Sequence, residues 1–415
     1  MKRKLDVYLH RHLVGNLVQD EHGQMTFDYT EAWLKDPTAI ALSRSLPLTK
    51  KHFNKNECRG FFAGVLPEES KREIVAKNLG ISDRNDYAML EKIGGECAGA
   101  VTFLPAGTEL PNSEDRYRAL TDKELAEILK ALPRRPLMAG DEGVRLSLAG
   151  AQDKIAVHVS GEKISIPLGV SPSTHILKPA IERFEGVVFN EAFCMKLARA
   201  VGVNAAHAET RQVEGIDYLL VERHDRTTSS NAPGAPQTLK REHQEDFCQA
   251  LGIVPENKYQ AEGGPSLKQC FALVREASSA PVIDLQALLD AVIFNFLIGN
   301  HDAHGKNFSF LYNGGQTRFA PLYDLLSTSY YPELSPKMAM KIGGEYLPAE
   351  ITVKLFEQLA EEAGLAKPMV KRRVPELAET ILSKIPAVTT DHAVVPAVAK
   401  LIQGNCDRTI KKFKA

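Results

Sequence analysis

The densest group of polar side chains that could do chemistry lies in residues 299–308, which read GNHDAHGKNF. Asp302 and Asn307 are five positions apart in this segment, and Asp324 follows in the stretch LYDL. Phosphoryl transfer needs a carboxylate near the attacking hydroxyl and oxygen ligands for a metal ion that bridges the nucleotide phosphates. Protein kinases arrange a catalytic Asp, a metal-binding Asn and a second metal-binding Asp in this order. The spacing therefore indicates a kinase-like loop.

The same residues leave two other interpretations open. His301, Asp302 and His304 are types that bind transition metals, so the segment is also compatible with a metal-hydrolase site. A surface loop without chemistry is the third interpretation, because Asp and Asn five positions apart are a weak signal by themselves. The choice among the three depends on the segments upstream.

Three upstream segments suit a nucleotide site. Residues 147–154 (SLAGAQDK) precede a strand, and small residues with exposed amides can cradle phosphates. Lys178 ends an apolar strand, where a partly buried ammonium needs an anionic partner, and Glu191 in the following helix could orient it. The apolar strand 218–222 runs into polar residues whose backbone could contact an adenine edge. A plain turn, a surface lysine and an edge strand are the alternative interpretations.

The elements around these residues can be predicted from periodicity. Leu5, Val7 and Leu9 alternate with polar residues, which predicts a half-buried strand, and the turn 20–23 (DEHG) predicts a hairpin. The pattern TDKE at residues 121–124 predicts a capped helix.

The second half of the chain is predicted to pass from strands to helices. Residues 155–159 and 163–166 predict a hairpin, and residues 190–201 predict a helix. The stretch 226–240 is rich in Thr, Ser, Asn, Pro and Gly and predicts an exposed loop. Beyond residue 245 we expect mainly helices, interrupted by a loop region over 299–340.

These patterns predict an α/β (α+β) chain with a two-lobed, protein-kinase-like fold and a small N-terminal α/β domain. We expect the N-terminal domain over residues 1–105 and a linker with a connecting helix over 106–143. A strand-rich nucleotide-binding lobe over 144–240 and a helical lobe over 241–415 follow. A cleft between a strand-rich and a helical lobe is a sensible place for a nucleotide.

Composition sets limits on the class of protein. The chain has 415 residues, with 51 Lys and Arg against 52 Asp and Glu, and 44% of its residues are hydrophobic. This excludes a disordered chain and a broadly basic nucleic-acid coat. The six cysteines contain no C-x-x-C pair, which suits reduced thiols in the cytoplasm. The apolar stretch 287–299 is too short for a bilayer, so we expect a cytoplasmic protein with no membrane partner.

The segments in order also resemble a known family, the HipA-type serine/threonine kinases. The resemblance runs over nearly the whole chain. It is carried by these motifs: LSRSLPL at 42–48, FFAGVLP at 61–67, SLAGAQDK at 147–154, HILKP at 175–179, VERHDR at 221–226, QEDFCQ at 244–249, HDAHGKNFS at 301–309 and YDLLS at 323–327.

The resemblance implies the toxin of a bacterial type II toxin–antitoxin module. Such a toxin transfers phosphate from ATP, with Mg²⁺, to a protein of the translation machinery, with glutamyl-tRNA synthetase the expected class of target. The implied partners are a HipB-like helix-turn-helix antitoxin and, through that complex, operator DNA.

The resemblance also implies roles for individual residues. Asp302 would be the catalytic base, Asn307 and Asp324 the Mg²⁺ ligands, and Ser147 the autophosphorylated serine. The residues implied in ATP binding are Leu148, Ala149, Gly150, Ala151, Gln152, Asp153, Lys178, Glu222, Arg223, His224, His304 and Lys306. His224 stands where an aromatic Phe is expected. A phosphate on Ser147 would add about −1.5 to −2 charges to a loop that holds phosphates, which predicts that it expels the loop.

Two alternatives to a protein kinase stay open. One is a kinase of similar fold that acts on a small molecule or lipid. The other is a non-catalytic corepressor, in which Lys411, Lys412 and Lys414 could touch DNA phosphates, although such a tail is usually solvated.

Overall fold

The computed structural model describes residues 3–111, 115–229 and 238–414. Its mixed strand and helix content confirms the predicted α/β class. The chain divides into two compact units. The first unit comprises Met1–Pro179, Arg211–Glu256 and Leu311–Gly315, and the second comprises Ala180–Thr210, Asn257–Phe310 and Gln316–Ala415.

A five-stranded sheet in the order β4-β3-β2-β1-β5 forms one part of the first unit. Leu5, Val7 and Leu9 are fully buried along β1, as their alternation predicts. The turn 20–23 joins β2 to β3, and Gly23 takes a φ of 76°, which confirms the predicted hairpin. The strands are β1 (Arg3–Leu9), β2 (His12–Gln19), β3 (Met25–Tyr29), β4 (His52–Phe53) and β5 (Val101–Pro105).

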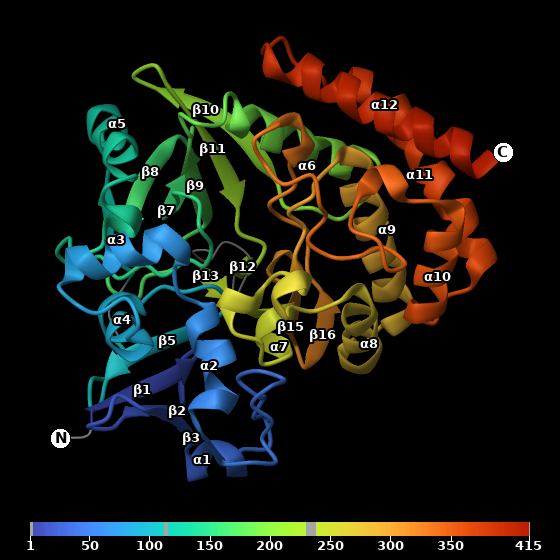
Figure 1. Ribbon diagram of the computed structural model, residues 1–415. Helices are drawn as coiled ribbons and strands as arrows, with labels where there is room; N and C mark the ends of the chain where they lie inside the picture. The colour runs from blue at the N-terminus through green and yellow to red at the C-terminus, as the bar shows by residue number, and fades with distance from the viewer. Residues whose placement is uncertain (1–2, 112–114, 230–237, 415) are drawn as a thin grey trace. The chain divides into compact units, whose positions relative to one another are not determined.

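Helices also lie in the described residues between 31 and 138, and among them α5 lies beside β8 of the second sheet (Figure 1). Thr121 and Glu124 form the capping box that their spacing predicts, so α5 begins where expected. The elements are α1 (Glu31–Lys35), α2 (Lys55–Gly64), α3 (Glu69–Leu79), α4 (Asp86–Ile93), α5 (Asp122–Ala131) and η1 (Pro136–Met138).

The second sheet has six strands in the order β10-β11-β9-β7-β8-β6. β7 and β8 pair antiparallel with His158 opposite Ser165, which confirms the hairpin predicted there. β9 pairs with both β7 and β11, so it lies in the interior of the sheet. The strands are β6 (Tyr117–Ala119), β7 (Ile155–Ser160), β8 (Lys163–Pro167), β9 (His175–Pro179), β10 (Ala208–Val213) and β11 (Ile216–Glu222).

The exposed loop predicted over 226–240 is wrong at both of its ends. β12 (Arg226–Ser229) and β13 (Thr238–Arg241) pair antiparallel there, and residues 230–237 lie outside the described residues. The Arg226 guanidinium is 2.6 Å from the Glu96 carboxylate, and both side chains are almost fully buried. This buried ion pair fixes the start of the segment. The polar composition of residues 226–240 gave no sign of the ion pair, because Glu96 is distant in the sequence. β14 (His243–Asp246) and α7 (Phe247–Ala250) follow.

The second unit is mainly helical, and the described chain beyond residue 245 consists mainly of helices, as predicted. Within it, α11 and α12 run along one another (Figure 1). The predicted helix over 190–201 is present as α6 with an earlier start. The helices are α6 (Val187–Ala200), α8 (Leu267–Ala277), α9 (Pro281–Ile298), α10 (Val353–Ala363), α11 (Lys367–Val388) and α12 (Val394–Lys414).

The central helix of the second unit is α9. The predicted apolar stretch 287–299 was drawn too short: α9 has 18 residues and is the one described helix long and apolar enough to cross a membrane by length and composition. Over half of it is buried within the structure, and Leu288, Leu289 and Ile293 are fully buried. Its contacts with α8, α11 and α12 are those of a core helix.

The region 299–340 was predicted as a loop, but it contains a short hairpin. β15 (Ser309–Asn313) and β16 (Gln316–Phe319) are joined by Gly314 and Gly315, which both have positive φ angles of 58° and 78°. Each strand is only four or five residues long, which explains why periodicity did not reveal the pair.

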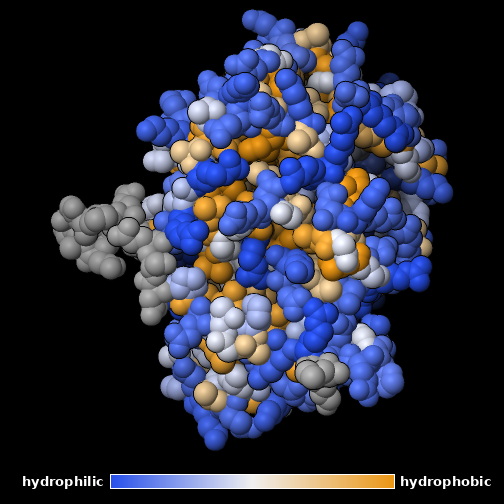
Figure 2. Space-filling model, turned by 90° about the vertical axis from the view of Figure 1, so that its left-hand side faces the viewer, coloured by the Kyte–Doolittle hydropathy of each residue, from blue (hydrophilic) through white to orange (hydrophobic). Residues whose placement is uncertain are grey.

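Hydrophilic side chains cover most of the face that lies on the left in Figure 1, and they interrupt its apolar areas (Figure 2). The large exposed apolar side chains among the described residues are few: Leu13, Val282, Ile283 and Leu347. The C-terminal lysines are folded into α12. The Lys412 ammonium donates to the carbonyls of Ala349 and Ile351, and Lys414 pairs with Glu379.

Candidate active site

The loop that carries Asp302 begins at the end of α9. Gly299 has a φ of 71°, and its N–H donates to the carbonyls of Asn295 and Phe296. This left-handed cap lets the chain leave the helix sharply. The Asn300 N–H then bonds the Asn295 carbonyl at 2.9 Å, so the loop starts from a buried, rigid helix end.

The Asn300 side chain connects the two acidic segments of the site. Its Nδ2 donates to the Asn295 side chain at 2.7 Å and to the backbone carbonyl of Asp324 at 3.2 Å. Its Oδ1 accepts from the N–H of Asp302 at 3.3 Å. Asn300 is only 4% exposed, so these bonds are made in the interior. One buried amide therefore holds the Asp302 and Asp324 segments side by side.

The turn after Asp302 orients Asn307. The His304 N–H donates to the Asp302 carbonyl at 2.9 Å and to Asn307 Oδ1 at 3.1 Å. The Asn307 N–H donates back to the His304 carbonyl at 3.0 Å, across η4 (Gly305–Asn307). Asn307 is thus fixed by the same short turn that carries Asp302, which explains why a spacing of five residues can be functional.

Asp324 adopts an unusual backbone conformation, with a φ of 53°. Asp tolerates the left-handed region better than most residues, and such strain gathers at functional sites. Its neighbour Tyr323 donates to the Lys306 carbonyl at 2.6 Å and is bonded to Ser309 at 2.7 Å. The Asp324 segment is therefore tied to both ends of the segment 306–309.

Asp302 itself is exposed, and a hydroxyl contacts it directly. The Tyr259 hydroxyl donates to Asp302 Oδ1 at 2.8 Å. The neighbouring His301 N–H donates to Thr328 Oγ1 at 2.7 Å, and burial lowers the pKa of His301 against a backbone hydrogen bond with Ser335. His301 is therefore held by its backbone and favours its neutral form.

The donor set fits magnesium better than a transition metal. Asn307 and Asp324 offer amide and carboxylate oxygens, the hard ligands that Mg²⁺ prefers, and Mg²⁺ completes its shell with water and phosphate oxygens. Within residues 3–111, 115–229 and 238–414, no three His, Cys, Asp or Glu side chains gather where they could hold one ion. A transition-metal site built from His301, Asp302 and His304 has no geometric support there.

In the first unit, the predicted phosphate loop starts at a fully buried Ser147. The Ser147 hydroxyl donates to the carbonyl of Val65 at 2.8 Å, and its N–H donates to the carbonyl of Glu96 at 2.9 Å. Both acceptors belong to the N-terminal part of the chain. In this conformation the hydroxyl of Ser147 is enclosed.

The rest of this loop is held by the segment 65–71. The Gly150 N–H donates to Glu68 Oε1 at 3.1 Å, and the Glu68 N–H donates to the Gly150 carbonyl at 3.3 Å. Lys71 lies 2.7 Å from the Asp153 carboxylate. Gly150 has a φ of 104°, which only glycine adopts readily. Three separate anchors therefore fix the loop on the N-terminal part of the unit.

The predicted adenine and lysine contacts lie on two paired strands of the second sheet. Lys178 stands on β9 opposite Leu219 of β11 and is 3% exposed. Glu222 ends β11 opposite His175 and is exposed. Glu191, which was considered as a partner of Lys178, lies in α6 of the second unit and is buried.

A buried charge network follows Glu222. The Arg223 guanidinium contacts Asp225 at 2.7 Å and Glu96 at 3.1 Å, and Arg226 contacts Glu96 at 2.6 Å. Burial opposes ionisation of Glu96, but Arg226, Arg241 and Arg223 outweigh burial and lower its pKa. The Arg223 guanidinium is therefore fully engaged by carboxylates of the first unit.

The backbone next to this network is also engaged. The Arg223 N–H donates to the carbonyl of Thr174 at 2.9 Å. The His224 ring is bonded to the Gln244 side chain at 2.7 Å, and burial lowers the pKa of His224. The neutral imidazole is therefore favoured at this position.

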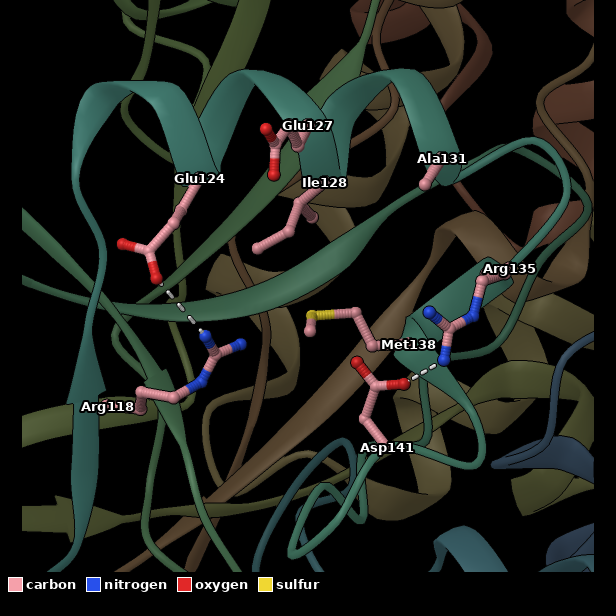
Figure 3. Close-up of a pocket in the computed structure, with 8 residues that line it drawn as sticks. All are labelled: Arg118, Glu124, Glu127, Ile128, Ala131, Arg135, Met138 and Asp141. Atoms are coloured by element: carbon pink, nitrogen blue, oxygen red, sulfur yellow. Dashed lines mark hydrogen bonds and ion pairs between the residues drawn. The ribbon is translucent and has the colours of Figure 1, made fainter.

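A cavity of about 290 Å³ opens elsewhere in the first unit, between β6, α5 and η1 (Figure 3). Arg118 pairs with Glu124 at 3.8 Å, and Arg135 pairs with Asp141. Its charged groups largely satisfy one another, and none of its lining residues is a predicted site residue. The lining residues are Arg118, Glu124, Glu127, Ile128, Ala131, Arg135, Met138 and Asp141.

The predicted site residues fall into two sets, one in each unit. The first unit holds Ser147, Leu148, Ala149, Gly150, Ala151, Gln152, Asp153, Lys178, Glu222, Arg223 and His224, and the second holds Asp302, His304, Lys306, Asn307 and Asp324. Sequence reasoning missed Asn300, Tyr259, Glu68 and Glu96. Asn300 stood inside the polar segment and was the one that could have been found.

Family models match both halves of the chain. Residues 5–104 match the model of the HipA N-terminal domain. Residues 146–385, more than half of the chain, match the model of the HipA-like C-terminal domain.

Individual relatives agree with the family models. The serine/threonine-protein kinase toxin HipA of Shewanella oneidensis is 30% identical, over 97% of this chain and 95% of its own length. Y4mE of Sinorhizobium fredii, which carries a provisional kinase name, is 46% identical over 94% of this chain and 92% of its own length. A solved HipA–HipB–operator DNA complex from Shewanella oneidensis matches with a TM-score of 0.86 and 28% identity, covering 99% of this chain and 98% of the other.

Proposed function

Because this chain belongs to the HipA family of serine/threonine kinase toxins, we propose that it transfers the γ-phosphate of ATP to a serine or threonine hydroxyl of another protein. One observation carries the proposal: the Asn300 side chain bonds both the Asp302 amide and the Asp324 carbonyl. A base and a metal ligand on neighbouring segments are what phosphoryl transfer requires.

In the proposed reaction, Asp302 accepts the proton of the substrate hydroxyl. The hydroxyl oxygen forms a bond to the γ-phosphorus, the bond between that phosphorus and the β–γ bridging oxygen breaks, and ADP leaves with the electron pair. Asn307 and Asp324 would hold Mg²⁺, which when bound neutralises the phosphate charge. The short turn through His304 keeps Asn307 in register with Asp302.

The proposed nucleotide contacts come from both sets of residues. Residues 148–153 would line the phosphates through backbone N–H groups. Lys178, a buried cation on the interior strand β9 of the same unit, would supply positive charge to a phosphate. Glu222 and His224 would meet adenine, whereas the predicted contact of Arg223 is disfavoured because its side chain and N–H are engaged within the unit. His304 and Lys306 would complete the nucleotide contacts.

The substrate and partners are proposed from the family. We infer a protein of the translation machinery as substrate, with glutamyl-tRNA synthetase as the first candidate, in the cytoplasm. We infer a HipB-like helix-turn-helix antitoxin as inhibitor and operator DNA as a partner of that complex. The solved Shewanella oneidensis structure that this chain matches is a complex of HipA with HipB and operator DNA, which supports these partners.

We also propose that Ser147 is autophosphorylated and that this inactivates the kinase. The Ser147 hydroxyl is enclosed and donates to the Val65 carbonyl, so a phosphate there would meet an acceptor oxygen. A group with about −1.5 to −2 charges cannot stay in that place, and the loop would have to leave. The phosphorylated form should bind ATP more weakly than the dephosphorylated form. Equal affinities would contradict the switch.

The decisive experiment uses γ-³²P-labelled ATP with cell lysate and three proteins: wild type, Asp302→Asn, and Asp391→Asn as a control at an exposed Asp of the same unit. We expect labelled protein with the wild type and the control but not with Asp302→Asn. Label on a small molecule or lipid alone would favour the small-molecule kinase. Absence of any Asp302-dependent label would favour a non-catalytic corepressor.

A further inference from the structure

We propose that Tyr259 is a positioning residue for the catalytic base. Its hydroxyl donates to Asp302 Oδ1 at 2.8 Å, and both residues belong to the second unit. The inference rests on the proposed function, in which Asp302 removes the proton of the substrate hydroxyl. Asp302 is exposed, so its carboxylate needs an external restraint to point in one direction.

The Tyr259 ring is itself fixed. It packs edge-on against His304, with ring centroids 5.2 Å apart at 76°. The Lys258 ammonium lies 5.4 Å from the ring centroid, and Lys258 is buried. An edge-to-face contact and a cation over the ring each favour one ring position. Tyr259 therefore connects Asp302 to His304, whose N–H orients Asn307.

The backbone that carries Tyr259 is also held tightly. The Tyr259 carbonyl accepts from Glu262 at 2.9 Å and from Gly264 at 2.8 Å, around η3 (Gln260–Glu262). A Cβ at Gly264 would lie 2.5 Å from the Asn257 carbonyl oxygen, so only glycine fits this turn.

The same segment is joined to the catalytic loop by a second route. The Gln260 N–H donates to the Ala339 carbonyl at 3.2 Å, and the Ala339 N–H donates to the His301 carbonyl at 2.7 Å. The Gln260 side chain accepts from the Lys341 N–H at 2.8 Å. The backbone next to Tyr259 is therefore connected through Ala339 to His301, the residue before Asp302, and this fixes the position of the Tyr259 hydroxyl relative to Asp302.

The chemistry of this contact has two consequences. A carboxylate has about four lone-pair positions, and Tyr259 uses one of them, so the substrate proton goes to another while the carboxylate cannot rotate freely. A donor to the ionised form of a carboxyl also stabilises that form and lowers its pKa. Tyr259 therefore keeps Asp302 oriented and ionised at the start of the reaction.

The test is Tyr259→Phe, which keeps the ring and removes only the hydroxyl. The measurement is steady-state transfer from γ-³²P-labelled ATP to the acceptor protein found by the labelling experiment, between pH 5 and 9. We expect kcat to fall about tenfold, the size expected for one hydrogen bond to a charged group. The KM for ATP should be unchanged, and the acidic limb of the kcat profile should move to higher pH.

The matched control is Tyr346→Phe. Tyr346 lies in the same unit, and its hydroxyl makes no hydrogen bond with any residue that the structure describes. It should keep wild-type kcat and the wild-type pH profile. Wild-type values in Tyr259→Phe would overturn the proposal, as would a lower kcat with an unmoved acidic limb. Label on Tyr259 itself would overturn it too, because Tyr259 would then be a phosphate acceptor.

A second variant keeps the test decisive if Tyr259→Phe folds poorly. Site-specific 3,5-difluorotyrosine at position 259 retains the donor and makes it more acidic. It should move the acidic limb of the kcat profile to lower pH, opposite to Tyr259→Phe, and no movement would contradict the proposal.

Asp302→Asn separates the proposed kinase function from the proposed role of Tyr259. Transfer that survives Asp302→Asn refutes the proposed function, whereas an inactive Asp302→Asn beside an unaffected Tyr259→Phe refutes only the role of Tyr259.

Discussion

The phosphate loop of the first unit and the catalytic loop of the second are held by different kinds of interaction. Residues 147–153 are held partly by charged side chains, in addition to the backbone and hydroxyl bonds of Ser147: the Glu68 carboxylate accepts from the Gly150 N–H, and Lys71 pairs with Asp153. Neutral groups anchor residues 299–308, chiefly the amide of Asn300. We infer that the interactions of residues 147–153 hold a nucleotide-binding loop in place, whereas those of residues 299–308 orient the reacting carboxylate.

The physical reason lies in what each loop must do. The Asn300 amide bonds the backbone of Asp302 and Asp324 and not their carboxylates, so it fixes the geometry of both segments without adding charge beside the reacting groups. A charged anchor is stronger but depends on its partner, because removal of one charge leaves the other uncompensated. Substitutions in the first unit should therefore affect stability and nucleotide binding, and those in the second should affect the chemical step.

The largest effect is expected at Glu96, which faces three arginines in the interior of the first unit. Glu96→Gln keeps the shape but leaves Arg223, Arg226 and Arg241 with less countercharge. Loss of one partner from a buried charge network costs about 3–5 kcal/mol, so the free energy of unfolding in urea should fall by that amount.

The control for Glu96 is Glu91→Gln. Glu91 pairs with Arg3 at the surface, where the Arg3 side chain is 46% exposed. Exposed pairs contribute about 0–1 kcal/mol, so this variant should unfold near the wild type. Equal effects of the two substitutions would show that burial of the charge network does not matter.

The next effect concerns pH and the buried carboxyl of Glu245. Burial raises the pKa of Glu245 to about 7, although Ser43, Tyr312 and the Arg44 N–H donate to it. The unfolded chain loses this proton near pH 4.5, so ionisation favours unfolding between that pH and about 7. Stability should therefore fall by about 3 kcal/mol as pH rises through this window, and stay level above it.

Glu245→Gln removes the ionisable group, so the difference in the free energy of unfolding between the variant and the wild type gives the contribution of Glu245 at each pH. His243, whose pKa burial lowers to about 4, acts in the opposite direction below pH 6.5 and is present in both proteins. The measurement is the urea midpoint at half-unit steps from pH 4 to 8. Parallel curves for the two proteins would contradict the assignment.

Asn300→Ala tests the neutral hydrogen bonds that hold residues 299–308. It removes the bonds to the Asp302 amide and the Asp324 carbonyl, and two misplaced groups should lower kcat about 100-fold. The KM for ATP should change little. Asn313→Ala, at an exposed position on β15, should retain full activity. A raised KM with normal kcat in Asn300→Ala would place this amide in nucleotide binding.

The sequence predicted local features better than long-range ones. The capping box at Thr121 was correct because all of its partners lie within four residues. The turn from Asp302 to Asn307 is local in the same sense, whereas the catalytic and metal-binding roles of Asp302, Asn307 and Asp324 stay predictions. The strand at Arg226 was missed because its partner Glu96 is 130 positions away. Tyr259 was missed because it is 43 positions from Asp302 and no spacing rule connects them.

The smallest effect is expected at Lys71, whose pair with Asp153 is mostly buried, with side chains 16% and 11% exposed. Lys71→Met removes one of several anchors, and the bonds of Ser147 and Gly150 still hold the loop, so the KM for ATP should rise about fivefold, which corresponds to about 1 kcal/mol. The kcat should be unchanged, because the loop is not in contact with the proton being transferred. Lys77→Met, at an exposed position on the same helix, should change neither constant. If Lys71→Met lowered kcat and left the KM alone, the charged anchors would be acting on the chemical step, and the division between the two loops would be wrong.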